Sequence, residues 1–150
     1  MPVAGELRLE ADVASLARVR RHVRRRLGVL GADDPCVHDL VQAVDEWVSN
    51  VIRHGYGGER GPVTVAVERV GDDAVATIRD AAPAFDPATA PSFDPASPVE
   101  SRRPGGMGVH LMHELTEGMT HRSLPGGGNE LTLRRALRAG APAAATGGDP

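Results

Sequence analysis

The sequence predicts an α/β (α+β) sandwich of two layers, in which a mixed, mostly antiparallel sheet is covered on one face by helices. Apolar residues recur at three- and four-residue steps, the period of an amphipathic helix, over residues 13–30, 35–54 and 107–117. The remaining strand-like runs are joined by tight glycine turns, which connect antiparallel neighbours. The apolar faces of the helices are therefore expected to cover the sheet.

The composition of the chain limits the classes of function that it can have. The 150 residues, 41% of them hydrophobic, suit one domain with a sizeable core. A formal charge of -3 and few aromatic residues argue against a general nucleic-acid binder. No apolar run approaches membrane-spanning length and no signal-peptide region opens the chain, so a cytoplasmic protein without membrane association is expected.

Two residue types exclude particular chemistries. Cys36 is the single cysteine, which excludes an internal disulfide and a cysteine-based zinc cage. All 17 basic residues are arginines, so no mechanism can use a catalytic lysine, and the Walker phosphate-loop pattern is absent.

The N-terminal part predicts a strand and a basic helix. Residues 5–10 alternate as a short strand would, and Asp12 can cap the helix over 13–30. The outer face of this helix carries a dense set of arginines, which either form an ordinary solvated face or dock an acidic protein partner: Arg18, Arg20, Arg21, Arg24, Arg25 and Arg26. Asp34 and Pro35 then give the cap and first-turn proline of the next helix.

The helix over 35–54 has a buried face and a chemical face. Glu46 and Asn50 are four residues apart and point the same way. An asparagine oxygen can ligate a divalent cation, while a glutamate can ligate it or take a proton from a hydroxyl or water. Taken alone, this pair is also compatible with an exposed polar pair on an ordinary helix.

The next segment predicts a hairpin and a loop. Residues 62–70 and 73–80 alternate as strands around Gly71 and Asp72, and the second strand ends at Asp80. Prolines recur over residues 83–104 and forbid a long regular element there. A loop of this length favours a lid or binding loop, with a disordered insert as the alternative.

A glycine turn opens the last helix. Gly105, Gly106 and Gly108 allow backbone amides to approach an anion, and a helix N-terminus favours phosphate. Two further strands, GMTHRSL and NELTLRRAL, flank a Pro-Gly-Gly-Gly turn. The folded domain is predicted over residues 5–136, and the low-complexity tail over 137–150 is expected to be disordered.

The order of these motifs resembles one family. An E-x-x-x-N helix, a hairpin ending in aspartate before Phe-Asp-Pro, a proline-rich lid, GGMG opening a helix and a final GGN-x-LTL strand look like the GHKL ATPase superfamily, which has the Bergerat ATP-binding fold. Gyrase, Hsp90, histidine kinases and MutL share this fold. Within it, the stretches EWVSNVIRHGYG and GGMGVHLMHEL are typical of the stand-alone anti-sigma-factor serine/threonine kinases.

This resemblance implies the cofactors ATP and Mg²⁺ and a role for each motif residue. Glu46 would be the catalytic general base, and Asn50 would bind Mg²⁺ at the phosphates. Asp80 would accept a hydrogen bond from the adenine amino group, with Thr132 beneath the adenine. The remaining assignments are phosphate contacts from the amides of Gly105, Gly106 and Gly108, and charge compensation by Arg102 or Arg103.

The resemblance also implies a function and partners. A protein of this branch phosphorylates an anti-anti-sigma (STAS) antagonist, sequesters a sigma factor, and commonly forms a homodimer, with no direct contact to nucleic acid. The alternative is a non-catalytic module that captures a regulatory partner stoichiometrically. Glu46 favours the kinase, whereas Ala82 favours the alternative, because the superfamily usually follows the aspartate with glycines as D-x-G-x-G.

Overall fold

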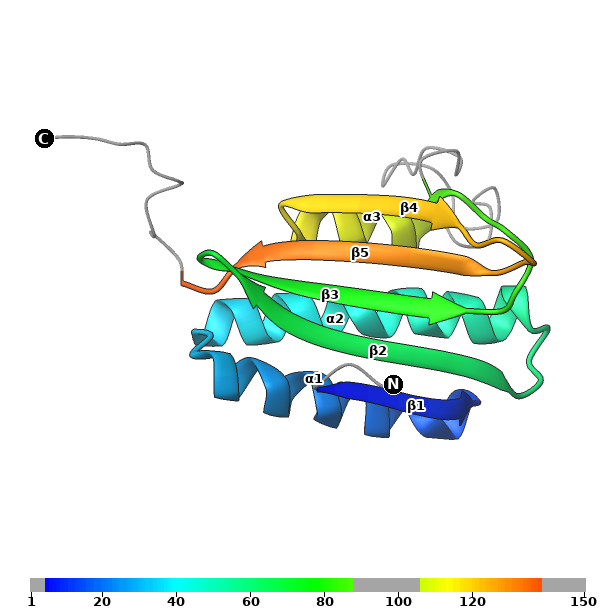
Figure 1. Ribbon diagram of the computed structural model, residues 1–150, viewed down its shortest axis with the longest axis horizontal. Helices are drawn as coiled ribbons and strands as arrows, with labels where there is room; N and C mark the ends of the chain where they lie inside the picture. Colours follow the sequence, from blue (N-terminus) through cyan, green and yellow to red (C-terminus); the bar gives the residue numbers. More distant parts are fainter. Residues whose placement is uncertain (1–4, 88–105, 139–150) are drawn as a thin grey trace, which may run out of the picture.

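In the described part of the chain, five strands form one sheet in the order β1-β2-β3-β5-β4 (Figure 1). The computed structural model describes residues 5–87 and 106–138. Each strand in this part of the chain pairs antiparallel with its neighbours, so the sheet is antiparallel where a mixed one was predicted. The strands are β1 (Glu6–Ala11), β2 (Gly61–Val70), β3 (Asp73–Asp80), β4 (Gly118–Ser123) and β5 (Asn129–Ala136).

Among the residues that the structure describes, three α-helices lie against the same face of this sheet. Figure 1 shows α1 behind β1, α2 behind β2 and β3, and α3 behind β4 and β5. Short turns of other helix types flank the α-helices, giving the elements η1 (Val13–Ser15), α1 (Leu16–Leu30), α2 (Asp34–Asn50), η2 (Val51–Gly55) and α3 (Gly106–Leu115). The predicted fold class, helices on one face of a largely antiparallel sheet, is confirmed. Within the described ranges, no helix is long and apolar enough to span a bilayer.

The turn η1, which leads into α1, and the helix α2 each begin at a side-chain cap. The Asp12 carboxylate accepts from the Ser15 backbone N–H at 3.0 Å, and the Ser15 hydroxyl accepts from the Asp12 N–H at 3.1 Å, a reciprocal capping box. The cap of α2 is Asp33, whose carboxylate accepts from the Cys36 N–H at 2.9 Å. The predicted cap, Asp34, is instead the first helical residue, because Asp33 reaches the free N–H three residues on.

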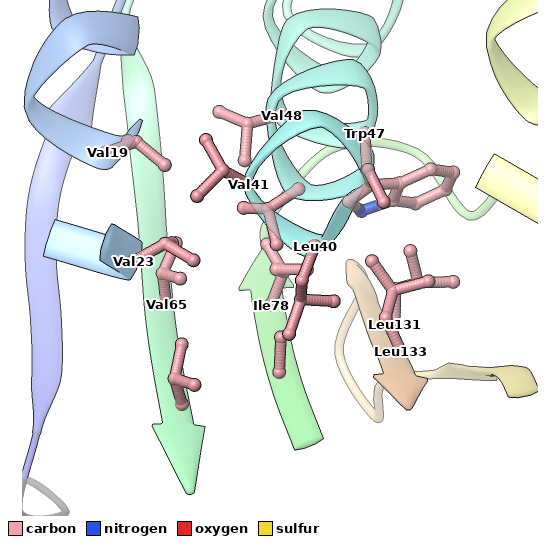
Figure 2. Packing of buried hydrophobic residues seen from close by; sticks show 14 of the residues in the cluster. Val19, Val23, Leu40, Val41, Trp47, Val48, Val65, Ile78, Leu131 and Leu133 are labelled. Atoms are coloured by element: carbon pink, nitrogen blue, oxygen red, sulfur yellow. The ribbon is translucent and has the colours of Figure 1, made fainter. Parts of the chain in front are cut away.

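The core lies between the helices and the sheet. Figure 2 shows side chains from α1 and α2 meeting side chains from β2, β3 and β5, and the Trp47 ring extends over Leu131 and Leu133. Trp47 is 1% exposed and therefore belongs to the core. Leu137 is also buried, and its N–H donates to the Asp72 carbonyl at 2.9 Å. The packed chain therefore continues one residue past the predicted boundary at 136; residues 139–150 lie outside the described part.

Strand alternation decides which polar residues face the helices. Ala76, Ile78 and Asp80 alternate with exposed or half-buried residues along β3, and all three are buried. On β5 the buried residues Asn129, Leu131 and Leu133 alternate in the same way. Asp80 and Asn129 therefore lie on the helix side, at the end of the sheet where β3 stops and β5 starts.

Candidate functional site

The chemical face of α2 lies at its C-terminal end. Glu46 and Asn50 are both half-buried, and directly after Asn50 the helix widens into the π-helical turn η2. In this turn the Tyr56 N–H donates to the Val51 carbonyl at 2.7 Å. The sequence predicted one uninterrupted helix to residue 54, since apolar spacing cannot show a single widened turn. Such turns are frequent at functional sites.

The first turn of α3 packs directly on this polar pair. A Cβ added to Gly108 would lie 2.9 Å from Glu46 Oε2 and 3.2 Å from Asn50 Nδ2, so only glycine fits without displacement. Gly108 is the third residue of α3, where backbone N–H groups have no acceptor within the helix. The structure thus brings together three predicted site residues, and the helix N-terminus there offers donors and positive partial charge to an anion.

Not every predicted phosphate contact lies in the described part. Gly106 is the first residue of α3, where its backbone N–H belongs to the same free set as that of Gly108. Gly105, Arg102 and Arg103 lie outside the described residues, as does most of the predicted lid over 83–104.

A cavity of about 300 Å³ opens beside Asn50. It lies between the C-terminal end of α2 with η2 and the segment that follows β3, and the Trp47 and Phe85 rings stack at 6.2 Å between centroids and 23° between planes. This volume is in the range of small-molecule sites, which are mostly apolar with few polar groups. The lining residues are Trp47, Asn50, Val51, His54, Gly55, Ala82, Pro83, Ala84, Phe85 and Asn129.

Asp80 presents one satisfied and one unsatisfied carboxylate oxygen. Oδ1 accepts from the Ala82 N–H and from Asn129 Nδ2, each at 2.9 Å. Oδ2 is buried and has no hydrogen-bond partner. Burial raises the pKa of Asp80, while the hydrogen bonds from Asn129 and Ala82 lower it. A buried acceptor without a donor costs about 1–3 kcal/mol, so a ligand N–H at Oδ2 would remove a penalty that the fold otherwise carries.

Other unsatisfied polar atoms gather near the same cavity. Among the described residues, the buried side-chain atoms without a partner are Trp47 Nε1, Asn50 Nδ2, Asp80 Oδ2 and Arg135 Nε. Trp47 and Asn50 line the cavity, and Asp80 is bonded to the lining residue Asn129. Buried polar groups are nearly always satisfied in folded proteins, so this concentration indicates a place where a polar ligand binds.

The prediction for Thr132 is wrong. Thr132 pairs with Thr77 of β3 and Thr120 of β4, and it lies on the opposite face of β5 from Asp80. The residue opposite Asp80 is Asn129, which the sequence analysis did not assign to the site. Thr132 lies three residues after Asn129 on β5. A shift by an odd number of residues moves a side chain to the other face of the strand, so Thr132 cannot lie on the same side as Asp80.

The methyl group of Ala82 has its own place in the packing. Ala82 is 3% exposed, and a Cβ on Gly55 would lie 2.6 Å from the Ala82 Cβ. The missing side chain of Gly55 therefore leaves the space that the Ala82 methyl fills. Tyr56 holds the same corner together: its hydroxyl donates to the Pro62 carbonyl at 2.6 Å and accepts from the Ala81 N–H at 2.8 Å.

The electrostatics of Glu46 suit proton transfer. Burial raises the pKa of its carboxyl, the neighbouring Asp45 raises it further, and Arg53 opposes both. A carboxylate whose pKa is moved toward neutrality is a stronger base than an exposed one.

Replacing Gly108 by alanine is expected to weaken anion binding at this site by at least about tenfold, because the new methyl would displace Glu46 and Asn50 or push α3 away. Gly28→Ala is the matched control, since a Cβ at Gly28 meets nothing within 4 Å. That control should raise the free energy of unfolding by about 0.5–1 kcal/mol and leave binding unchanged. Titration with a nucleoside triphosphate and thermal denaturation measure both effects; native-like binding by Gly108→Ala would contradict the proposed packing.

The chain is similar to a known protein family and to solved structures. The family of histidine kinase-like ATPase domains matches residues 9–135. Among solved structures, the chain is similar to the RsbU and RsbW domains of Rv1364c from Mycobacterium tuberculosis, with 23% identity, a TM-score of 0.59, and coverage of 91% of this chain and 33% of that one. This likeness shows the fold, and the chain spans about a third of that protein's length.

A second similar structure is the Acinetobacter baumannii histidine kinase AdeS, with 13% identity, a TM-score of 0.43, and coverage of 87% of this chain and 68% of that one. The family match covers nearly all of the described residues and confirms the resemblance to the GHKL superfamily. It also implies that the chain binds ATP. The chain belongs to the histidine kinase-like ATPase domain family.

Proposed function

We propose that this chain is an ATP- and Mg²⁺-dependent protein serine/threonine kinase that phosphorylates an anti-anti-sigma (STAS) antagonist and sequesters a sigma factor. The observation that carries the proposal is the close approach of Gly108 to both Glu46 and Asn50, next to the cavity that Asn50 lines. A helix N-terminus, a neutral oxygen ligand and a base there match the requirements of phosphoryl transfer, in which positioning and electrostatics dominate.

Each residue has a defined role in this proposal. The unsatisfied Asp80 Oδ2 accepts from the exocyclic amino group of adenine, and the backbone amides of Gly106 and Gly108 receive the phosphates. Asn50 fits Mg²⁺, since this ion favours oxygen ligands and is usually held by one or two side chains together with substrate phosphates. When bound, Mg²⁺ neutralises the charge that develops on the phosphoryl oxygens.

Glu46 would act on the attacking hydroxyl. It takes the proton from the serine or threonine of the antagonist while that oxygen bonds to phosphorus, and the bond from phosphorus to the ADP oxygen breaks. Its raised pKa supports this role, because the proton acceptor is not an ordinary exposed carboxylate.

Two surface features support protein partners. Arg18, Arg21, Arg24 and Arg25 are exposed on α1, away from the sheet. Such a cluster attracts an acidic protein surface and steers its association. β1 is an edge strand of the sheet in the described part of the chain, and pairing along this edge would allow a homodimer through β1 and α1. A cytoplasmic location is part of the same proposal.

Stoichiometric capture without catalysis is the second candidate. Ala82 favours it, because a buried methyl stands where related sequences have glycine beside the base. In that case the chain would hold its regulatory partner without transferring phosphate, and Glu46 would have no effect on regulation.

Calorimetric titration of the native chain with ATP, with and without Mg²⁺, tests the proposal. Binding that tightens with Mg²⁺ is expected. Asn50→Ala should lose most of that gain, about tenfold or more in affinity, and keep the weaker binding seen without Mg²⁺. A folded native chain that does not bind ATP at millimolar concentration overturns the kinase and favours the capture module.

A further inference from the structure

Asn129 connects the base-binding carboxylate to the rest of the sheet. Its Nδ2 donates to Asp80 Oδ1 at 2.9 Å and to the Pro83 carbonyl at 3.2 Å. Its Oδ1 accepts from the Phe85 N–H at 2.8 Å. A carboxylate and a carbonyl can only accept and a backbone N–H can only donate, so these partners fix which way the Asn129 amide points.

His121 completes this network from the edge strand β4. The ring is 6% exposed, and its Nε2 lies 2.7 Å from Asn129 Oδ1. Since Oδ1 must accept, Nε2 must carry the proton, which sets the tautomer of the ring. The other nitrogen, Nδ1, faces Asp86 Oδ1 at 4.0 Å.

His121 holds the side chain of Asn129 from the neighbouring strand. It is two residues from Ser123, which pairs with Asn129, so it reaches Asn129 diagonally across the strands. Asn129 Oδ1 thereby receives two donors, and the amide loses the freedom to turn away from Asp80. An ordered amide in turn keeps a donor on Oδ1 of Asp80 and leaves Oδ2 as the atom for the ligand.

We propose that His121 is a positioning residue for base recognition, which acts through Asn129 to hold the Asp80 carboxylate with Oδ2 toward the base. This inference rests on the proposed function, in which Asp80 reads the adenine amino group. According to this proposal, His121 helps the site to prefer a base that carries an amino group over a base that carries a carbonyl at the same position.

The test compares two substitutions at the same site in the full chain. His121→Leu keeps bulk but removes the donor, whereas His121→Gln places an N–H close to the position of Nε2. His38→Leu is the control, because His38 is an exposed histidine on α2. Affinities for ATP and for inosine triphosphate, which carries a carbonyl in place of the amino group, are measured for each variant.

His121→Leu is expected to weaken ATP binding about tenfold and to change inosine triphosphate binding little, so that discrimination between them falls about tenfold. His121→Gln and His38→Leu should discriminate as the native chain does. A merely structural loss would lower both affinities together. The inference is overturned if His121→Leu keeps native discrimination or if His121→Gln loses as much as His121→Leu.

Nitrogen NMR of the ligand-free chain gives a readout that is independent of nucleotide. The proton of the His121 ring is expected on Nε2, and the Asn129 side-chain amide signals should shift in His121→Leu but not in His121→Gln. A ring protonated on Nδ1 alone would contradict the network. A native chain that binds neither nucleotide overturns the proposed function, and the NMR result then decides by itself whether His121 holds Asn129.

Discussion

Asp80→Asn is expected to reduce ATP affinity by about a hundredfold or more. The native Oδ1 already accepts two hydrogen bonds, from Ala82 and Asn129. The asparagine oxygen would take over these two donors and leave its NH₂ group where Oδ2 now lies. That group is a donor, so it would face the adenine amino group donor to donor. A lost charged hydrogen bond and an unpaired buried donor together cost about 3 kcal/mol, which corresponds to a loss of this size.

The same substitution should not destabilise the fold. Burial raises the pKa of Asp80, so the folded chain holds the ionised carboxylate at a cost. A carboxyl whose pKa is raised on folding lowers stability as the pH rises through that folded value. The neutral amide removes this cost at neutral pH, so the melting temperature of Asp80→Asn is expected to equal or exceed that of the native chain.

Calorimetry and thermal denaturation of the same preparation separate the two effects. Asp73→Asn is the matched control, since Asp73 lies at the other end of β3 and pairs with Arg134 at 2.8 Å. It should bind ATP as the native chain does. Native-like affinity in Asp80→Asn would mean that Oδ2 is not the atom that reads the base.

The local part of the site was predictable from the sequence. Glu46 and Asn50 are one helical turn apart, so their common orientation follows from the helical period alone. Gly108 was predictable as a turn residue that opens a helix, because three of the four residues from 105 to 108 are glycines. Each of these motifs needs only short-range geometry, whereas the packing of Gly108 on Glu46 and Asn50 is a tertiary contact that the structure adds.

The part that depends on strand register was not predictable. Thr132 and Asn129 belong to one strand, and only the pairing of β5 with β3 decides which of them meets Asp80. The register is set by contacts between residues far apart in the chain, and an error of three positions also reverses the face. His121 was missed for a related reason, since its contact with Asn129 depends on how the last two strands pair.

The packing of Ala82 against Gly55 could not be predicted from the sequence either. In the sequence, Ala82 is a departure from glycine two residues after Asp80, the proposed base-binding aspartate. In the structure its methyl fills the space beside Gly55, a residue of η2 that has no side chain of its own. A single sequence shows each of these residues separately, and only the packing shows that they form a pair.

Glu46→Gln is expected to slow phosphoryl transfer to a STAS antagonist by about 10²–10⁴-fold while ATP affinity stays within about threefold of native. Glutamine has nearly the same size as glutamate, so the contact with Gly108 is kept, but its amide cannot take a proton from the attacking hydroxyl. Asp73→Asn is again the control, because Asp73 lies at the far end of β3 and pairs with Arg134 at 2.8 Å; it should keep the native transfer rate.

The pH dependence distinguishes a base from a residue that only fills space. A base must be ionised to act, and burial with the neighbouring Asp45 raises the pKa of Glu46. Native transfer should therefore rise with pH through a value above that of an ordinary glutamate, whereas the residual rate of Glu46→Gln should lack this step. Native rates in Glu46→Gln would exclude Glu46 as the base. A chain that binds ATP but transfers no phosphate in either form would instead favour the capture module, because nucleotide binding would then serve only to hold a partner-binding conformation.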